Sequence, residues 1–253
     1  MAITLLGFKN IKSLVLLVTA SNMFIRTDLS GFFKFFWKHS IINAFMAKEM
    51  AIKTGNKGLS DECFLAGLLH DIGQVALFNA DPTKYGEVRR RVATEAVRIS
   101  IVEQELFGTN HREVGAEVLR NWSFPDVYID SAKEHGSPNV TSEFKQIILL
   151  ISISDFLTSN IDTHVEAPLD VKLLDDIMRQ SSLTYEDLGY YTGEFLEKMR
   201  SSTSAARYFR STDAIHSERR RGISALIPKV AEANQYSKLE YGAPRVPDAN
   251  TLA

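Results

Sequence analysis

Two aspartates lie at helical positions that the surrounding sequence reserves for apolar side chains. Asp71 comes three residues after Leu68 and four before Val75, so its carboxylate lies along an apolar stripe. Asp155 closely follows the almost unbroken apolar run of residues 147–153. A carboxylate in such a place is costly to bury unless it is ion-paired, hydrogen-bonded or bound to a metal. Each of the two positions therefore demands a partner.

Two histidines extend this set. His39 follows Phe35 and Phe36 by four and three residues, which places its imidazole on an aromatic helix face, and His70 directly precedes Asp71. Taken singly, a histidine among aromatic residues is more often a hydrogen-bonded core residue than a ligand. Two histidines and two aspartates on separate helices, however, supply the nitrogen and oxygen ligands that one divalent cation needs. The pattern indicates a metal site; a purely structural polar network of His39, His70 and Asp155 is the alternative.

The elements that position these residues are predicted to be helices. Apolar residues recur at three- and four-residue spacings nearly throughout, and strict alternation is rare, so we expect an all-α fold. Ser60 and Asn110 are predicted helix N-caps, and Gly67 and Gly73 are interpreted as leaving room for an ion or a substrate. Helices are predicted over residues 32–54, 61–79, 83–107, 111–122, 126–135, 142–159, 168–180 and 185–200.

The composition excludes several classes of protein. The chain has 253 residues, with 29 Lys and Arg against 31 Asp and Glu, which is not the balance of a charged disordered tail or of a protein that attracts nucleic acid through its overall field. The single cysteine, Cys63, excludes a disulfide framework and a cysteine metal cage, and is expected to be buried and inert. The runs 89–91 and 219–221, each of three arginines, are predicted to be solvated helix faces.

No apolar segment approaches the roughly 20 residues of a membrane helix. Near the start of the chain, Lys9 and Lys12 precede the short apolar run 14–20, which resembles an export signal. The helical spacing of the apolar residues in the same stretch favours an ordinary amphipathic helix. We therefore expect a cytoplasmic protein.

The same residues carry a family resemblance. His39, the pair His70–Asp71, and Asp155 resemble the H…HD…D signature of the HD superfamily of metal-dependent phosphohydrolases. In more detail, the sequence resembles the HDOD family, the HD-related output domain of bacterial signalling proteins. Its blocks cover about residues 2–162 in the family's order and comprise residues 36–40, 64–73, 105–116, 122–125 and 134–138. The resemblance implies an HD-type multi-helix bundle.

The resemblance also implies a role for six residues. It assigns the superfamily's metal ligands to four of them: His39, His70, Asp71 and Asp155. His111 and His135 match further histidines that bind a second metal in the related HD-GYP phosphodiesterases. The implied cofactor is a divalent metal ion, and mixed nitrogen and oxygen ligands fit iron, manganese, zinc or magnesium alike.

The implied chemistry is phosphoester hydrolysis. A divalent cation lowers the pKa of bound water to about 7 in favourable sites and neutralises phosphate charge. Asp71 is predicted to bridge or to orient that water. His111, in the first turn of its helix, is predicted to be kept neutral by the positive end of the helix dipole. Asp71 and His111 are thus the predicted catalytic residues.

Departures from the related enzymes leave a second function open. Gly136 stands where many relatives have a second consecutive histidine, Gln74 stands where HD-GYP enzymes carry lysine, and no GYP-like segment is present. The alternative is a catalytically silent HD-fold module for regulation or protein interaction. An enzyme would act on a phosphorylated small molecule or a nucleotide, and a module would bind a signalling protein. A homodimer is compatible with both.

The expected organisation has three parts. Residues 1–162 are the predicted HDOD domain, 163–235 a C-terminal helical extension, and 236–253 a mobile tail. The segment from Ala2 to Leu16 resembles a part well inside the HDOD domain. The N-terminal helices of a full HDOD domain are therefore expected to be lacking.

Overall fold

The structure is a computed structural model that describes residues 31–95, 97–162 and 171–201. These residues form helices and no strand, which confirms the predicted all-α class. In chain order the elements are α3 (Phe32–Lys53), the short 3-10 helix η1 (Lys57–Leu59), α4 (Ser60–Leu69), α5 (Ile72–Ala80), α6 (Pro82–Glu95), α7 (Ile99–Phe107), α8 (His111–Asn121), α9 (Asp126–Glu134), α10 (Lys145–Asp162), α11 (Val171–Met178), α12 (Tyr185–Tyr190), the π-helix η2 (Tyr191–Phe195) and α13 (Leu196–Ser201).

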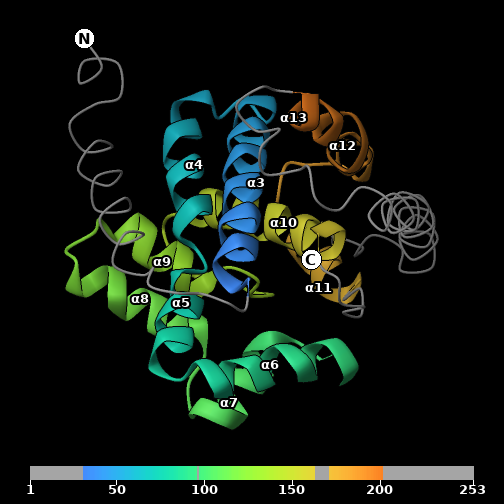
Figure 1. The fold of residues 1–253 in the computed structure, drawn as a ribbon. Coiled ribbons are helices and arrows are strands. Elements are labelled where there is room, and N and C mark those ends of the chain that lie inside the picture. Colours follow the sequence, from blue (N-terminus) through green and yellow to red (C-terminus); the bar gives the residue numbers. More distant parts are fainter. Residues whose placement is uncertain (1–30, 96, 163–170, 202–253) are drawn as a thin grey trace, which may run out of the picture.

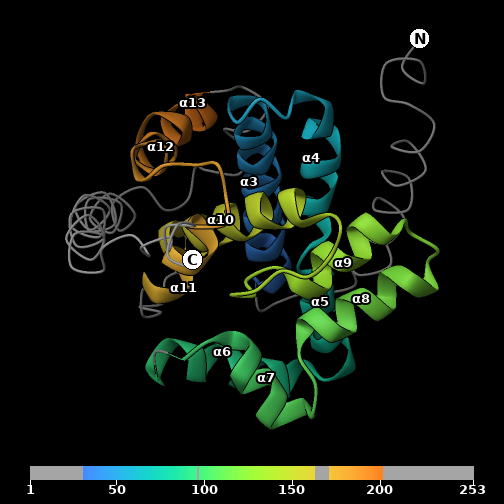
Figure 2. The ribbon, with the colours of Figure 1, turned by 180° about the vertical axis from the view of Figure 1, so that it is seen from behind.

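The helices are arranged around a central pair. α3 and α4 pack side by side, α10 crosses α3, and α5 continues from α4 to pack against α8 (Figure 1). α8 and α9 lie on one side of this centre, and α11 to α13 lie on the other, as both views show (Figures 1 and 2). α6 and α7 pack together at the end of the molecule nearest α5. Segments far apart in the sequence thus meet at the middle of α3.

Aromatic residues of α3 and aliphatic residues of α10 contribute to a core that the other helices complete. The Phe32 ring stacks on Phe78 at 4.3 Å and meets the edge of Tyr85 at 5.4 Å, which ties the start of α3 to α5 and α6. The apolar residues of α10 from 147 to 151 are all buried. Polar side chains enclosed by these helices are consequently removed from water.

The predicted helix over residues 61–79 is broken in the middle, so that prediction is wrong in its continuity. α4 ends at Leu69 and α5 begins at Ile72, and the backbone N–H of Gln74 donates to the Asp71 carbonyl at 2.9 Å across the turn between them. The turn changes the direction of the chain and brings α5 against α8. Ser60 is the first residue of α4 and makes no side-chain cap, so the predicted N-cap at Ser60 is also wrong.

The two glycines beside this turn serve close helix packing. A Cβ atom at Gly73 would lie 1.9 Å from the carbonyl oxygen of His111, and one at Gly67 would lie 2.9 Å from the Cα of Ala44. The space that each glycine leaves is filled by the backbone of a neighbouring helix. The interpretation that they leave room for an ion or a substrate is therefore wrong.

Other predicted boundaries have mixed outcomes. The stretch 83–107 is two helices, because the extended Arg98 (ψ 137°) separates α6 from α7. Asn110 is confirmed as an N-cap, since its side-chain oxygen accepts the N–H groups of Arg112 and Glu113 at 3.0 and 3.3 Å. Gly108, with φ of 74°, ends α7 as the sequence predicts. The helices in 171–178 and 185–201 match the helices predicted over 168–180 and 185–200.

Two surface and membrane predictions can be compared with the structure. Arg90 and Arg91 form exposed ion pairs with glutamates on α6 and α7, as expected of a solvated face, while Arg89 lies over the rings of Phe32 and Phe35. Among the residues that the structure describes, one stretch, Lys57–Ala80, is long and apolar enough to cross a membrane by length and composition, so the prediction that no segment approaches this length is wrong. Its most apolar window is 72% buried inside the fold, so its place in the core accounts for its character.

Some predictions lie outside the described residues. These are the N-terminal helix with its export-signal alternative, the lack of preceding helices, the arginine run 219–221 and the tail 236–253. The boundary between residues 162 and 163 falls at the start of an undescribed segment and stays a prediction.

Candidate metal centre

The first group of side chains joins α3, the α4–α5 turn and α10. Nε2 of His39 lies 3.2 Å from Oδ1 of Asp155, 3.4 Å from Oδ2 of Asp71 and 3.3 Å from Nε2 of His70. Nε2 of His70 lies 3.5 Å from Asp71 Oδ2 and 3.6 Å from Asp155 Oδ1. The four predicted residues of the first site are thus brought together, each offering one atom to a common point.

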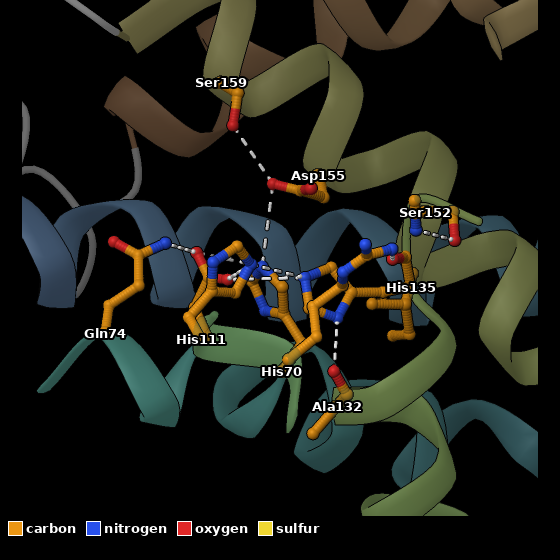
Figure 3. A network of polar contacts seen from close by, with 12 residues as sticks. His70, Gln74, His111, Ala132, His135, Ser152, Asp155 and Ser159 are labelled. Atoms are coloured by element: carbon orange, nitrogen blue, oxygen red, sulfur yellow. Dashed lines mark hydrogen bonds and ion pairs between the residues drawn. The ribbon is translucent and has the colours of Figure 1, made fainter. Parts of the chain in front are cut away.

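The second group uses the other oxygen of the same aspartate. Oδ1 of Asp71 lies 3.5 Å from Nε2 of His111, the first residue of α8, and 3.4 Å from Nε2 of His135, just after α9. The two histidine nitrogens are 3.3 Å apart. Figure 3 shows the rings of His70, His111 and His135 converging, with Asp155 approaching from α10. Asp71 therefore lies between two candidate sites and belongs to both.

Three of the four imidazoles are held in one orientation by the ring nitrogen that faces away from the centre. Nδ1 of His70 lies 2.7 Å from the Gly67 carbonyl, and Nδ1 of His135 lies 2.9 Å from the Ala132 carbonyl. Nδ1 of His111 lies 2.5 Å from a carboxylate oxygen of Glu103. Since these acceptors only accept, each Nδ1 carries a proton, and whenever the ring is neutral its Nε2 directs a lone pair inward. Lone pairs that converge in this way need a cation or a shared proton between them.

The spacing of the inward atoms fits coordination. A divalent ion held at about 2.1 Å keeps neighbouring ligand atoms about 3.0 to 3.4 Å apart in octahedral or tetrahedral geometry. The nitrogen and oxygen atoms of each group lie 3.2 to 3.6 Å apart across its closest pairs. The residues present therefore fit a metal in each group, with slight contraction of the shell. Imidazole and carboxylate donors suit zinc, iron and manganese, and carboxylate oxygen also suits magnesium.

Burial and mutual charge shift the titration of these groups in the metal-free protein. Burial alone would raise the pKa of Asp71 and of Asp155, but the surrounding histidines hold the pKa of each carboxyl well below its usual range. Burial would lower the pKa of His39, but hydrogen bonds to Asp155 and Asp71 raise it to about 10. Burial lowers the pKa of His135 despite its contact with Asp71. The centre thus keeps its two carboxylates charged.

In the metal-free protein the pKa of His111 is shifted opposite to the direction that the helix dipole predicts. Burial does favour the neutral ring, but the charge of Glu103 and its hydrogen bond to Nδ1 raise the pKa of His111. A buried carboxylate in contact with the ring outweighs the partial charge of a helix terminus. Glu103 itself is fully buried on α7 and also accepts the backbone N–H of His111 at 2.8 Å.

Sequence reasoning missed three residues behind the ligands: Gln74, Tyr85 and Glu103. Gln74 donates to Oδ2 of Asp71 at 2.6 Å, and the Tyr85 hydroxyl lies 3.1 Å from Gln74 Oε1 and 3.0 Å from Glu103 Oε1. Gln74 was singled out only as a departure from a family pattern. Glu103 lies two residues before the matched block 105–116, and no local sequence pattern marks it as buried.

The centre is almost closed to solvent. The side chains of His39, His70, Asp71, His111 and His135 expose 7% or less of their surface, while that of Asp155 exposes 23%. Asp155 is therefore less buried than its sequence neighbours predict and marks the open edge of the centre. Gly136 has a left-handed backbone (φ 65°) and donates its N–H to Ser152 Oγ at 2.9 Å.

Comparisons with known proteins agree with this fold. A solved structure from Shewanella amazonensis named a "putative phosphohydrolase" is 23% identical, with a TM-score of 0.58 over 78% of this chain and 71% of its own. An HDOD domain protein with unknown function from Geobacter sulfurreducens is 24% identical, with a TM-score of 0.50 over 75% of this chain and 61% of its own. A "putative signal transduction protein" from Marinobacter aquaeolei is 18% identical, with a TM-score of 0.51 over 78% and 39%. At these identities the likeness shows a shared fold.

Similarity is also found at the level of the sequence. An uncharacterized protein of Treponema pallidum is 22% identical over 162 residues, which is 64% of this chain and 31% of that protein. The chain thus spans about a third of the length of that relative. The family of HDOD domains matches residues 1–138, more than half of the chain. With the converging His and Asp residues inside an all-helical bundle, this match shows that the chain belongs to the HDOD family.

Proposed function

We propose that this protein binds two divalent metal ions and hydrolyses phosphoesters as part of bacterial signal transduction in the cytoplasm. The observation that carries the proposal is the position of Asp71. Its Oδ2 faces His39 and His70, and its Oδ1 faces His111 and His135, all within 3.5 Å. A carboxylate that presents each oxygen to a separate pair of imidazole lone pairs is arranged to bridge two ions.

Each residue of the centre has a distinct task. Bound divalent ions supply Lewis acidity, which neutralises phosphate charge and makes water more acidic. Asp71 would hold the metal through its ionised oxygens and would orient the attacking water. Asp155, at the open edge, would complete the first site and lie nearest to an entering substrate. The histidines hold their lone pairs inward through the contacts of Nδ1, so no rearrangement of those rings is needed.

Charge balance supports an anionic substrate. Two divalent ions, set against the carboxylates of Asp71, Asp155 and Glu103, leave one net positive charge in a centre that is largely removed from water. A low-dielectric site strengthens its attraction for an anion. We therefore propose a phosphorylated small molecule or a nucleotide as the substrate. The near-neutral chain as a whole, at −2, does not oppose its approach.

A catalytically silent regulatory module is the second candidate, and one observation favours it. Only Asp155 among the ligands reaches more than a tenth exposure, so a bulky substrate has little access to the buried ions. In that case the metal would hold the bundle together for a signalling partner. A homodimer is compatible with both candidates.

Metal analysis with a matched pair of variants tests the proposal. We expect purified protein to hold close to two ions, His70→Ala/Asp71→Ala to hold none, and Asp61→Ala to keep both. Asp61 lies exposed on α4, the helix that leads into the His70–Asp71 turn, and pairs with Lys48 at 2.8 Å, so it controls for the loss of a carboxylate. Negligible metal in all three proteins would refute the metal centre.

A substrate screen then separates the two candidates. Phosphomonoesters, nucleotides and cyclic dinucleotides are offered to the metal-loaded protein and to His70→Ala/Asp71→Ala. Turnover that the double variant abolishes and Asp61→Ala retains supports the hydrolase. Full metal loading with no turnover of any of these classes favours the silent module.

A further inference from the structure

Behind the ligands lies a closed ring of polar contacts that links Asp71 to His111 through three side chains that are not ligands; it is buried at Tyr85 and Glu103 and part-buried at Gln74. It runs from Asp71 to Gln74 (2.6 Å), Tyr85 (3.1 Å), Glu103 (3.0 Å) and His111 (2.5 Å), and His111 Nε2 returns to Asp71 at 3.5 Å. Tyr85 and Glu103 are fully buried. Three helices, α5, α6 and α7, contribute the side chains that are not ligands.

We propose that Glu103 is the positioning residue of the second metal site and that Tyr85 and Gln74 couple it to Asp71. The inference rests on the proposed two-metal function and deepens it, because it names the residue on which the second ion depends. Glu103 does not reach the ion itself. It acts through the imidazole of His111.

The contacts of Glu103 explain why His111 depends on it. Its Oε2 accepts both the backbone N–H of His111, at 2.8 Å, and the ring Nδ1–H, at 2.5 Å. One carboxylate oxygen thus fixes the helix start and the ring together. A histidine whose outer N–H is bound by a carboxylate presents a more basic lone pair to a metal, and loss of such partners weakens metal binding.

The two sites differ in the number of carboxylate ligands. The first site has Asp155 as well as the shared Asp71, while within the described ranges the second has Asp71 and two histidines. Glu103 supplies a further negative charge to the second site from behind His111, without being a ligand itself. The second ion is therefore expected to bind after the first and to be the one that Glu103 controls.

Tyr85 and Gln74 link Glu103 to Asp71. Their few hydrogen-bond donors fix how this link is made. The ionised Asp71 requires the amide nitrogen of Gln74 to face its Oδ2, since the flipped amide would place two oxygens 2.6 Å apart. The amide oxygen of Gln74 then faces Tyr85, whose single hydroxyl proton is shared between Gln74 and Glu103. Tyr85 thus orients the carboxylate of Glu103 and the amide that holds Asp71.

A titration of the metal-free protein with Mn²⁺ alone tests the inference. Glu103→Gln keeps the size and an acceptor oxygen of the side chain but removes its charge, and Glu105→Gln is the matched control, because Glu105 is an exposed residue of α7 that pairs with Arg91. We expect two Mn²⁺ per chain in wild type and in Glu105→Gln. In Glu103→Gln the first ion is kept and the second binds 10- to 100-fold more weakly.

Two further measurements make the result specific. The magnetic signal of a coupled Mn²⁺ pair should appear in wild type and be lost from Glu103→Gln at one to two equivalents, which a role in packing alone would not produce. Tyr85→Phe, which keeps the ring in the core, should weaken the second ion less than Glu103→Gln does. If Glu103→Gln does not fold, the affinity of Tyr85→Phe for the second Mn²⁺ tests the inference in its place.

The outcomes separate this inference from the hydrolase. Wild-type affinity for the second Mn²⁺ in both Glu103→Gln and Tyr85→Phe overturns the inference, and so does a wild-type chain that binds one ion only. Two ions in wild type, a weakened second ion in Glu103→Gln and no turnover of phosphoesters would leave the inference standing while the hydrolase falls.

Discussion

At the scale of single residues, the centre depends on which atom of each side chain faces inward. Asp71 offers one oxygen to each site, and His70, His111 and His135 keep their protons on the outer nitrogen. The network can hold a proton in place of a metal, and this explains the raised pKa of His39. Metal and protons therefore compete for the same lone pairs.

This competition predicts how the stability of the metal-free protein changes with pH. The pKa of His39 rises from 6.5 to about 10 in the folded state, so its contribution is complete below pH 6.5 and is lost as the pH rises through 10. His111, whose pKa is also raised, adds a loss of the same sign. The pKa of His135 is lowered in the folded state, so His135 affects stability below pH 6.5. There its contribution to the free energy of unfolding falls as the pH falls.

Thermal unfolding of chelator-treated protein between pH 6.5 and 10 checks this. We expect the Tm to fall steadily over this range. The fall corresponds to a loss of on the order of a few kcal/mol in the free energy of unfolding. The variant His39→Asn should start lower and change less over the same range. An equal slope in wild type and variant would show that His39 is not the group that titrates.

The ligands were predictable from the sequence, but the residues behind them were not. His39, Asp71 and Asp155 stand out because a polar residue on an apolar stripe contradicts the helical pattern. Glu103 lies two residues from the exposed Glu105 on a short helix of mixed character, and only tertiary packing distinguishes the buried residue from the exposed one. Tyr85 likewise gains its role from its contacts with Gln74 of α5 and Glu103 of α7, which the helical pattern around Tyr85 does not predict.

At the scale of elements, helix ends position most of the centre. His70 and Asp71 form the turn between α4 and α5, His111 begins α8, and His135 follows the end of α9. At a helix end the side chain and the backbone groups can both be held by one neighbour, as Glu103 holds His111. The periodic pattern predicted one continuous helix through residues 70 and 71 because the residues on both sides keep the same apolar face; the break follows from the contact of α5 with α8.

The contact of α5 with α8 predicts a strong effect of Gly73→Ala. Its Cβ would overlap the His111 carbonyl, at 1.9 Å, and the Gly115 nitrogen, at 2.6 Å, and backbone atoms cannot rotate away as side chains do. We expect a loss of about 3 kcal/mol or more in the free energy of unfolding, because overpacking of this kind forces helices apart. Since His111 begins α8, the second metal should also bind more weakly.

Gly86→Ala is the matched control for Gly73→Ala. Gly86 lies within α6, and a Cβ there meets nothing within 4 Å, so this substitution should raise stability by up to about 1 kcal/mol through helix propensity. Denaturant unfolding of both variants gives the comparison. Equal and small effects of the two substitutions would contradict the close approach of α5 to α8.

At the scale of the whole molecule, the helices that follow the site share one core with those that form it. Buried residues of α11, α12 and α13, among them Ile177, Leu188 and Leu196, belong to the same hydrophobic cluster as the buried residues of α3, α4 and α10. The sequence predicted these helices but assigned them to an extension beyond residue 162. Helical periodicity shows that an apolar face exists and does not show which neighbour covers it.

A shared core predicts that α12 unfolds together with the bundle that carries the metal centre. Leu188 in α12 and Leu119 in α8 are both fully buried, so Leu188→Ala and Leu119→Ala should each cost about 2 to 5 kcal/mol. Both variants should unfold in a single transition, with the same midpoint by circular dichroism and by the fluorescence of Trp37 and Trp122, because one cooperative core has no separate step for its C-terminal helices. If Leu188→Ala leaves the main transition unchanged while Leu119→Ala lowers it, the C-terminal helices form a unit of their own, and their packing cannot stabilise the metal centre.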